Sequence, residues 1–258
     1  MILKKVANYI LNFIFPPKCI FCGKLLEINT DKHFCNDCRC GIPYLKDMIC
    51  CKRCGKPLVS FGDKVLCYNC INETHFYYKQ ITSVFEYENK PRESILRYKT
   101  NPKPIYAKIY AELMYERYLE VYSGETIDFI VNVPSDKKRI AKKGADHAGL
   151  ICEEFSKISG IPYYKDCLVK IKRTKKQSTL SYTERQTNLN NSIRVSNPDR
   201  VKGKTVLILD DVCTTCASIK ECSRELKFCN CKKILALTLC TTPKKRINKK
   251  VENKKQFI

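Results

Sequence analysis

The stretch Val206-Leu207-Ile208-Leu209-Asp210-Asp211-Val212-Cys213-Thr214-Thr215-Cys216-Ala217-Ser218 joins a short apolar run, two adjacent carboxylates and a turn of small and hydroxylated residues. A helical pattern runs from Ser218 to Phe228 directly after it. This order predicts a buried strand, a loop and a helix in succession. At the carboxyl end of a parallel strand, carboxylates can hold ribose hydroxyls, and free N–H groups at a helix start can hold a phosphate. The stretch therefore predicts a site for a phosphorylated sugar.

Apolar runs alternate with helical patterns on both sides of this stretch. The expected strands are 81–87, 129–133, 206–209 and 234–239, and the expected helices begin at Pro91 and cover 104–122, 146–158 and 218–228. Strands that alternate with helices form a parallel sheet whose two faces are both covered. We therefore expect an α/β fold with a parallel sheet and helices on both faces.

The first part of the chain contains four Cys-x-x-Cys pairs that share one period. The pairs are Cys19/Cys22, Cys35/Cys38, Cys51/Cys54 and Cys67/Cys70, and twelve residues separate each pair from the next. A shift of 32 residues maps the first two pairs onto the last two, and it also maps Gly23 onto Gly55 and Lys24 onto Lys56. This register indicates that one cysteine-containing unit has been duplicated.

Two Cys-x-x-Cys pairs supply the four thiolates that a tetrahedral Zn²⁺ takes. The eight cysteines therefore predict two structural zinc sites in a small Cys-rich zinc-ribbon domain, with the metal supplying much of its folding free energy. With no open coordination position, neither zinc is expected to be catalytic. Sequential pairing is the simplest arrangement, but the equal spacers also permit an interleaved one.

The composition is that of a globular protein, and the charge is strongly basic. The chain has 258 residues and a formal net charge of +22, from 48 Lys and Arg against 26 Asp and Glu. Such an excess favours nucleotides, nucleic acid or an acidic membrane surface, although a general preference for surface lysine explains it equally well. The chain is too long for a disulfide-dense secreted scaffold in spite of its 18 cysteines.

The first residues of the chain do not read as a secretory signal or as a membrane span. Asn8 and Asn12 interrupt the apolar segment, which is too short to cross a bilayer. We expect a helix packed on the protein itself, with a helix on a membrane surface as the alternative. The expected location is the cytoplasm, with the inner face of the membrane as the corresponding alternative.

Three segments of the chain resemble motifs of known protein families, and they follow one another in the chain as those motifs do. The Asp-Asp-x-x-Thr-Thr stretch described first resembles the phosphoribosyl pyrophosphate motif of type I phosphoribosyltransferases. The segment from Val133 and Pro134 through Arg139 to Lys143–His147, and the segment from Arg173 to Asn188, are similar to motifs of the ComF family. A cysteine-rich zinc ribbon ahead of this domain is also that family's layout, so the chain is identified as resembling the ComF family over about residues 16–242.

The resemblance implies a type I phosphoribosyltransferase-like domain and a division of the chain. The expected parts are an N-terminal helix at 1–16, a double zinc ribbon at 17–75, the phosphoribosyltransferase-like domain at 76–242 and a basic tail at 243–258. It also implies a set of residues that bind phosphoribosyl pyrophosphate together with Mg²⁺. The ribose contacts are Asp210 and Asp211, the 5′-phosphate cradle is Thr214, Thr215, Cys216, Ala217 and Ser218, and the pyrophosphate region holds Pro134, Ser135, Arg139 and Lys143.

Some residues depart from the family pattern. Cys216 takes the place of the loop glycine, where a side chain can hinder unusual backbone angles and the approach of a phosphate. Asp146 and His147 stand where the family has Asn-Gln, and Lys143 replaces an arginine. No residue in the sequence is recognisable as a general base for an acceptor. The sequence therefore predicts no catalytic residues and does not decide whether the protein is an active enzyme.

The family resemblance implies a function in natural transformation. We expect a DNA-uptake protein with a phosphoribosyl pyrophosphate site and affinity for single-stranded DNA, consistent with the basic charge. The alternative is a phosphoribosyltransferase of nucleobase or nucleotide metabolism, because a fold alone does not decide a function. A third reading is a zinc-ribbon docking protein for a helicase or another partner in the DNA-uptake machinery.

Overall fold

A computed structural model describes most of the chain. The described residues are 16–26, 33–58, 65–73, 75–136, 140–141, 144–172 and 191–242. Several sequence expectations lie outside these residues: the N-terminal helix apart from Pro16, Arg139, Lys143, the segment from Arg173 to Asn188, and the basic tail.

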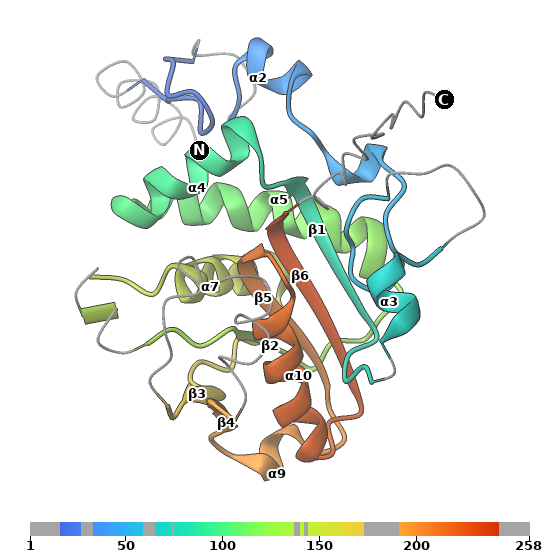
Figure 1. Ribbon diagram of the computed structural model, residues 1–258. Coiled ribbons are helices and arrows are strands. Elements are labelled where there is room, and N and C mark those ends of the chain that lie inside the picture. The colour runs from blue at the N-terminus through green and yellow to red at the C-terminus, as the bar shows by residue number, and fades with distance from the viewer. Residues whose placement is uncertain are drawn as a thin grey trace, which may run out of the picture.

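A four-stranded parallel sheet forms the centre of the larger domain (Figure 1). Its spatial order is β1 (Gln80–Glu86), β6 (Lys233–Thr241), β5 (Thr205–Cys213) and β2 (Phe129–Asn132). The neighbours in this order all pair in parallel register, for example Leu207 opposite Leu235. The parallel sheet expected from the sequence is therefore confirmed.

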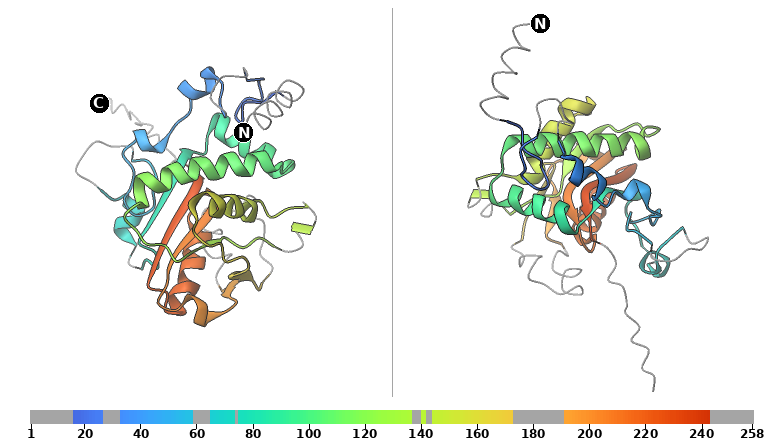
Figure 2. Two further views of the ribbon diagram at one scale, coloured as in Figure 1. Left: turned by 180° about the vertical axis from the view of Figure 1, so that it is seen from behind. Right: turned by 90° about the horizontal axis from the view of Figure 1, so that it is seen from above.

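Helices cover both faces of this sheet. On one face lie α5 (Pro104–Tyr122) and α7 (His147–Ser159), which Figure 2 shows from behind, and on the other lies α10 (Ala217–Phe228). The strand residues alternate between the two faces. Leu207, Leu209 and the odd-numbered leucines of β6 join one apolar cluster, whereas Val206, Ile208, Ile234 and Ala236 join the other. Both faces are apolar, so the sheet is buried between two layers of helices.

The remaining described elements are α4 (Asn89–Thr100) and several shorter ones. The shorter ones are α2 (Asn36–Cys40), the 3-10 helix η1 (Leu45–Asp47), α3 (Tyr68–Asn72), β3 (Leu168–Lys170), β4 (Ile193–Val195) and α9 (Pro198–Val201). Of the remaining elements, the sequence predicted only α4, because the others span too few residues for hydrophobic periodicity to show. The antiparallel pair of β3 and β4 lies near α10.

Strand β5 is longer than the sequence predicted. The apolar run suggested an end at Leu209, but Asp210 still pairs with Thr238 and Cys213 pairs with Thr241 of β6. The neighbouring strand continues to Thr241, so its backbone groups satisfy those of the polar residues in β5. The two carboxylates thus stand on a hydrogen-bonded strand and not on a loose turn.

The two cysteine units pack against different parts of the larger domain. In the first unit, the carbonyl oxygen of Ile20 accepts hydrogen bonds from Ser94 Oγ at 2.6 Å and from Arg97 Nη2 at 3.1 Å, both on α4. In the second unit, the carbonyl oxygen of Arg53 accepts a hydrogen bond from the Ile81 N–H of β1 at 2.9 Å. Both units are therefore fixed to the domain that carries the sheet.

Candidate functional site

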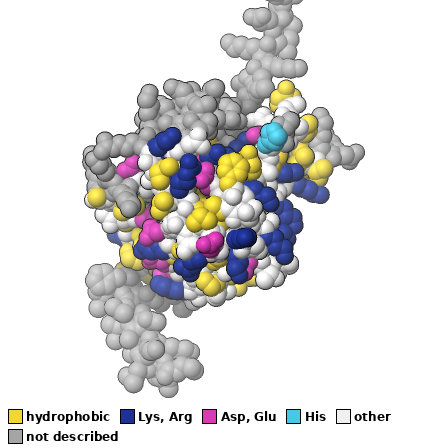
Figure 3. Space-filling model, turned by 90° about the horizontal axis from the view of Figure 1, so that it is seen from below, with side chains coloured by type: hydrophobic (Ala, Val, Ile, Leu, Met, Phe, Trp, Pro, Cys, Tyr) yellow, Lys and Arg dark blue, Asp and Glu magenta, His cyan; other side chains and the backbone are white. Residues whose placement is uncertain are grey.

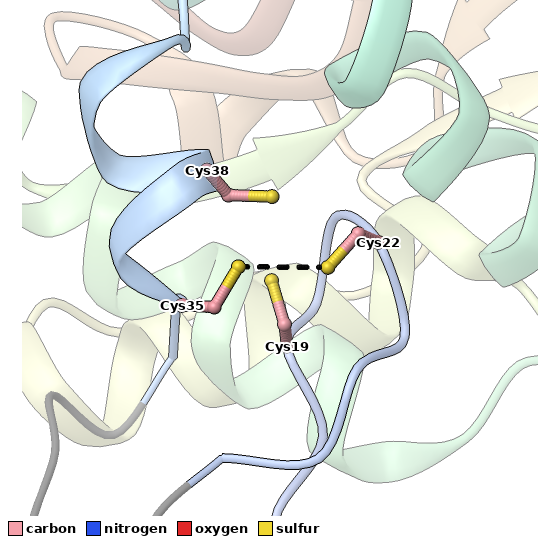
Figure 4. A group of neighbouring side chains, drawn as sticks. All are labelled: Cys19, Cys22, Cys35 and Cys38. Atoms are coloured by element: carbon pink, nitrogen blue, oxygen red, sulfur yellow. Dashed lines mark hydrogen bonds between the residues drawn. The ribbon is translucent and has the colours of Figure 1, made fainter.

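The eight Cys-x-x-Cys thiols form two separate clusters. Within each cluster the sulfur atoms all lie within 4.8 Å of one another, and Figure 4 shows the four sulfurs of the first cluster converging. The first cluster holds Cys19, Cys22, Cys35 and Cys38, and the second holds Cys51, Cys54, Cys67 and Cys70. The structure thus pairs the cysteines sequentially and not in the interleaved arrangement.

The spacing of the sulfurs fits zinc. The Cys22 and Cys35 sulfurs are 3.6 Å apart, and the Cys54 and Cys67 sulfurs are 3.7 Å apart. Four thiolates at about 2.3 Å from a central Zn²⁺ place neighbouring sulfurs about 3.8 Å apart. All four ligand positions are filled by protein, so these are structural sites.

Each cluster is expected to hold one zinc independently of the other. Atomic emission on the purified chain should give two zinc ions per chain, and Cys38→Ala should lower that value to one. The reason is that three thiolates bind Zn²⁺ less tightly than four and leave an open position. Retention of both zinc ions in Cys38→Ala would contradict the assignment of this thiolate.

A cavity of about 950 Å³ lies at the carboxyl ends of the parallel strands. The sequence-predicted residues that line it are Pro134, Ser135, Asp210, Asp211, Thr214, Thr215, Cys216, Ala217 and Ser218. Helix α4 closes one side with Leu96, Lys99 and Thr100. The structure thus brings together the described members of the predicted set, in the position where open α/β sheets bind ligands.

The two carboxylates of the site have different surroundings. Lys99 Nζ on α4 donates to Asp211, with 2.9 Å to Oδ1 and 2.8 Å to Oδ2. Asp210 Oδ1 accepts a hydrogen bond from the Asp211 N–H at 2.9 Å, and burial, followed by the charge of Asp211, raises the pKa of Asp210 to about 8. Burial works against the charge of Lys99, but the Asp211 carboxylate outweighs it and the pKa of Lys99 is raised. The pair therefore presents one carboxyl group that is held by Lys99 beside one whose ionised form is disfavoured by burial.

Asp210 is expected to lower the stability of the free protein as the pH rises. An unfolded aspartate has a pKa of about 3.9, so between that value and its raised folded pKa the folded state binds a proton that the unfolded state has lost. Stability therefore falls with rising pH through this window. The melting temperature of Asp210→Asn should exceed that of the parent chain by more at pH 8 than at pH 6. A difference that stays constant across these pH values would contradict the raised pKa.

The loop between β5 and α10 leads directly into the N-terminus of a helix. Helix α10 has twelve residues, and the N–H groups of its first turn have no partner within the helix. Cys216 is its N-cap residue and has φ 62° and ψ 5°, in the left-handed region that favours glycine. Cys216 therefore has a backbone conformation that a glycine adopts more readily than a cysteine.

The Cys216 side chain is packed inward. It is 5% exposed, and its sulfur lies 3.0 Å from the sulfur of Cys213, which is also buried. The hydrogen bond between these two side chains lowers the pKa of the Cys213 thiol. The cysteine thus fills space in the apolar cluster beneath the loop and does not fill the cradle.

Because of this packing, Cys216→Gly is expected to leave ligand affinity nearly unchanged. The dissociation constant for phosphoribosyl pyrophosphate should stay within about threefold, equivalent to about 0.6 kcal/mol. Titration calorimetry on the parent and variant chains, both kept reduced, provides the measurement. Binding that tightens tenfold or more would show instead that the cysteine obstructs the cradle.

The loop after β2 forms the opposite wall of the site. Ser135 Oγ donates to Asp146 Oδ1 at 3.5 Å, and Asn132 Nδ2 donates to Asp146 Oδ2 at 3.1 Å. Asn132 in turn accepts a hydrogen bond from the Tyr163 hydroxyl at 2.7 Å. Burial raises the pKa of Asp146, which stands at the N-cap of α7. Asp146 therefore fixes the Pro134–Ser135 loop from behind.

Sequence reasoning did not assign a role at this site to Lys99, Asp146 or Lys56. Lys99 and Asp146 reach the site from helices α4 and α7, and Lys56 reaches the loop from the second cysteine unit. Nothing in the linear pattern marks Lys99 among so many lysines. Two features of the sequence could have pointed to the other two residues. Asp146 stands where the family has asparagine, and Lys56 occupies the position equivalent to Lys24 in the internal repeat.

Two family models match two different segments of the chain, the cysteine-rich segment and the domain that carries the sheet. A double zinc ribbon domain model matches residues 10–71, and a phosphoribosyl transferase domain model matches residues 100–257. The second match covers more than half of the chain. Among the described residues, no helix combines the length and apolar character needed to cross a bilayer.

Relatives with known names match over much of the chain. Competence protein F of Haemophilus influenzae is 24% identical over 221 residues, which cover 84% of this chain and 93% of that protein. The DNA utilization protein YhgH of Escherichia coli K12 is 29% identical over 115 residues, 45% of this chain and 50% of that protein. The YhgH protein of Salmonella typhimurium is 24% identical over 195 residues, 74% of this chain and 84% of that protein.

Solved structures match more distantly. An adenine phosphoribosyltransferase aligns with a TM-score of 0.37 and 11% identity, over 56% of this chain and 82% of its own. A Trypanosoma cruzi hypoxanthine phosphoribosyltransferase aligns with a TM-score of 0.34 and 9% identity, over 54% and 64%. In this chain, the two family models place a double zinc ribbon ahead of a phosphoribosyl transferase domain. The chain belongs to the phosphoribosyl transferase domain family, and the double zinc ribbon ahead of that domain matches the layout of the ComF family.

Proposed function

We propose that this chain is a ComF-like protein of DNA uptake that binds phosphoribosyl pyrophosphate with Mg²⁺ and handles single-stranded DNA. The observation that carries the ligand assignment is the single cavity that contains both carboxylates of β5 and the loop at the start of α10. The names of the relatives, a competence protein and DNA utilization proteins, support the biological setting. The eighteen cysteines, eight of which form the two zinc clusters and none of which is in a disulfide, favour a reducing compartment such as the cytoplasm.

Each part of the ligand meets suitable chemistry in the cavity. The N–H groups of Thr215 to Ser218 can receive the 5′-phosphate, which the positive end of α10 favours. The carboxylate oxygens of Asp210 and Asp211 can accept hydrogen bonds from the ribose hydroxyls. The Pro134–Ser135 loop faces the remaining space, where the pyrophosphate belongs. Mg²⁺ on the pyrophosphate and ribose oxygens would offset the charge of the ligand.

Several surface features support the binding of single-stranded DNA. The formal net charge is +22, and Figure 3 shows Lys and Arg side chains spread over one face and densest along one edge. Tyr68 on α3 is 73% exposed, and the exposed Lys52 bonds through its backbone to Val65 nearby. Exposed aromatic rings can stack on bases and basic side chains can bind phosphates, so a surface that carries both suits single-stranded nucleic acid. Exposed aromatic and basic side chains also occur on surfaces that bind proteins. The alternative ligand for the zinc ribbons is therefore a helicase or another protein of the DNA-uptake machinery.

The DNA-binding proposal is tested by affinity at different salt concentrations. An oligothymidylate should bind the full chain, and the logarithm of the association constant should fall linearly as the logarithm of the salt concentration rises. Tyr68→Ala should weaken binding by about tenfold, the lower end of the effect of losing one stacked base. Tyr77, whose ring contacts Phe228, offers a control in Tyr77→Ala. No binding at low salt would contradict the proposal.

A second candidate function is phosphoribosyl transfer to a nucleobase. The cavity extends past the loop to Lys170 and Ile193, which gives an acceptor room next to the proposed ribose position. Release of pyrophosphate that depends on an added nucleobase would support this enzyme function. Binding of the ligand without such release would favour a role limited to recognition.

A further inference from the structure

The two lysines that the internal duplication places in equivalent positions have different partners. In the first unit, Lys24 Nζ donates to Asp37 Oδ2 at 2.9 Å, and both side chains are 68% exposed. The residue 32 positions after Asp37 is Asn69, so the second unit lacks this carboxylate. Its lysine, Lys56, reaches instead across to the larger domain. The duplicated units have therefore diverged at this pair of positions.

Lys56 contacts the backbone of the proposed phosphate loop directly. Its Nζ atom donates to the carbonyl oxygen of Thr214 at 2.5 Å and to the carbonyl oxygen and hydroxyl of Thr242 at 3.1 Å each. The Thr242 hydroxyl also donates to the Thr214 carbonyl oxygen at 3.2 Å. The Lys56 side chain is half-buried, so these charge-assisted bonds are sheltered from bulk water.

These contacts fix the direction of the loop N–H groups. A trans peptide holds its C=O and N–H on opposite sides, so a Thr214 carbonyl directed at Lys56 turns the Thr215 N–H away from Lys56. The preceding carbonyl, of Cys213, accepts from the Thr241 hydroxyl and from the Thr242 N–H, both at 3.1 Å. The loop thus has its carbonyls held on one side, which leaves its N–H groups on the other.

The second unit is held firmly enough to act as a support. The Ile81 N–H of β1 donates to the Arg53 carbonyl at 2.9 Å, two residues from Cys51. Glu73, which follows α3, forms an ion pair with Lys220 on the first part of α10. Contacts on both sides of Lys56 therefore join this unit to the sheet and to the helix that begins at the phosphate loop.

We propose that Lys56 is a positioning residue for the phosphate-binding loop, and that the second zinc ribbon is thereby part of the phosphoribosyl pyrophosphate site. The ammonium group holds the Thr214 carbonyl, and the N–H groups beyond it are pre-oriented for the 5′-phosphate. The first ribbon has no equivalent part, because its Lys24 is paired on the surface. This inference rests on the proposed function, since it concerns the affinity for the same ligand.

The test is titration calorimetry with phosphoribosyl pyrophosphate and Mg²⁺ on full-length variants. Lys56→Met should weaken binding by about 10- to 100-fold, the range expected for losing hydrogen bonds from a charged donor. Lys56→Arg, which keeps a cationic donor, should restore most of the affinity. Lys24→Met is the matched control in the other unit and should bind like the parent chain. Zinc content and melting temperature should be measured on every variant.

A second variant separates positioning from folding. Asn69→Asp recreates in the second unit the carboxylate that holds Lys24 in the first, so it should draw Lys56 from the loop and weaken binding without removing the lysine. The inference is overturned if Lys56→Met and Asn69→Asp both bind like the parent chain, or if Lys24→Met weakens binding as much as Lys56→Met. A parent chain that does not bind the ligand would overturn the proposed function itself, and the inference with it.

Discussion

Replacing both Asp210 and Asp211 by asparagine is expected to weaken the binding of phosphoribosyl pyrophosphate by at least about 100-fold. The two carboxylates line the cavity at the end of β5, where they can accept hydrogen bonds from the two ribose hydroxyls. Hydrogen bonds to a charged group contribute about 1.5–3 kcal/mol each, and asparagine also presents N–H donors that the hydroxyl hydrogens repel. Titration calorimetry at a fixed Mg²⁺ concentration measures the change.

The controls for this variant are chosen from the structure. Asp211→Asn removes the partner of Lys99, so Asp210→Asn alone should also be measured. Asp128 is a matched aspartate just before β2, away from the carboxyl ends of the strands, where it bonds to Lys204 and to the Thr205 N–H. Asp128→Asn should bind like the parent chain. A double variant that binds within threefold of the parent would remove these carboxylates from the site.

Alanine at Gly55 is expected to destabilise the protein much more than alanine at the equivalent Gly23. Both glycines have positive φ, 67° and 78°, so either substitution should cost about 1–2 kcal/mol for the left-handed backbone. A Cβ at Gly23 meets nothing within 4 Å, whereas a Cβ at Gly55 would lie 2.6 Å from the Ile81 carbonyl oxygen. Displacing β1 or the ribbon should add about 1–3 kcal/mol for Gly55→Ala.

This pair of variants measures how tightly the second ribbon packs on the sheet. Unfolding of zinc-replete samples by urea, followed by a spectroscopic signal of the larger domain, gives the two free energies. Because Ile81 belongs to β1, the loss in Gly55→Ala should appear in that signal. Equal losses for Gly23→Ala and Gly55→Ala would show that the ribbon is not packed against Ile81.

The sequence was sufficient for the sheet because the signals there are local. The runs at Val206–Leu209 and 234–239 have the continuous apolar character of strands covered on both faces, and Pro104 marks the start of α5. The cysteine register likewise predicted two four-thiolate sites, because metal ligands carry their spacing in the sequence. Only the choice between sequential and interleaved pairing required coordinates.

The parts of the site that the sequence did not predict depend on contacts between distant segments. Lys99 meets Asp211 across 112 positions, and Lys56 meets Thr214 across 158. No local periodicity encodes such a pairing, and the chain has 48 Lys and Arg residues from which to choose. The inward packing of Cys216 on Cys213 was also not predicted, because it depends on the left-handed backbone at that position.

The central claim is that the cavity at the carboxyl ends of β5 and β2 binds phosphoribosyl pyrophosphate. The most direct measurement is calorimetric titration of the full-length, zinc-replete chain with this ligand and Mg²⁺, with ribose 5-phosphate and pyrophosphate titrated separately. We predict saturable binding that is tighter than for either fragment, because the intact ligand reaches the loop, the carboxylates and the Pro134–Ser135 wall together. The absence of saturable heat with the intact ligand would contradict it.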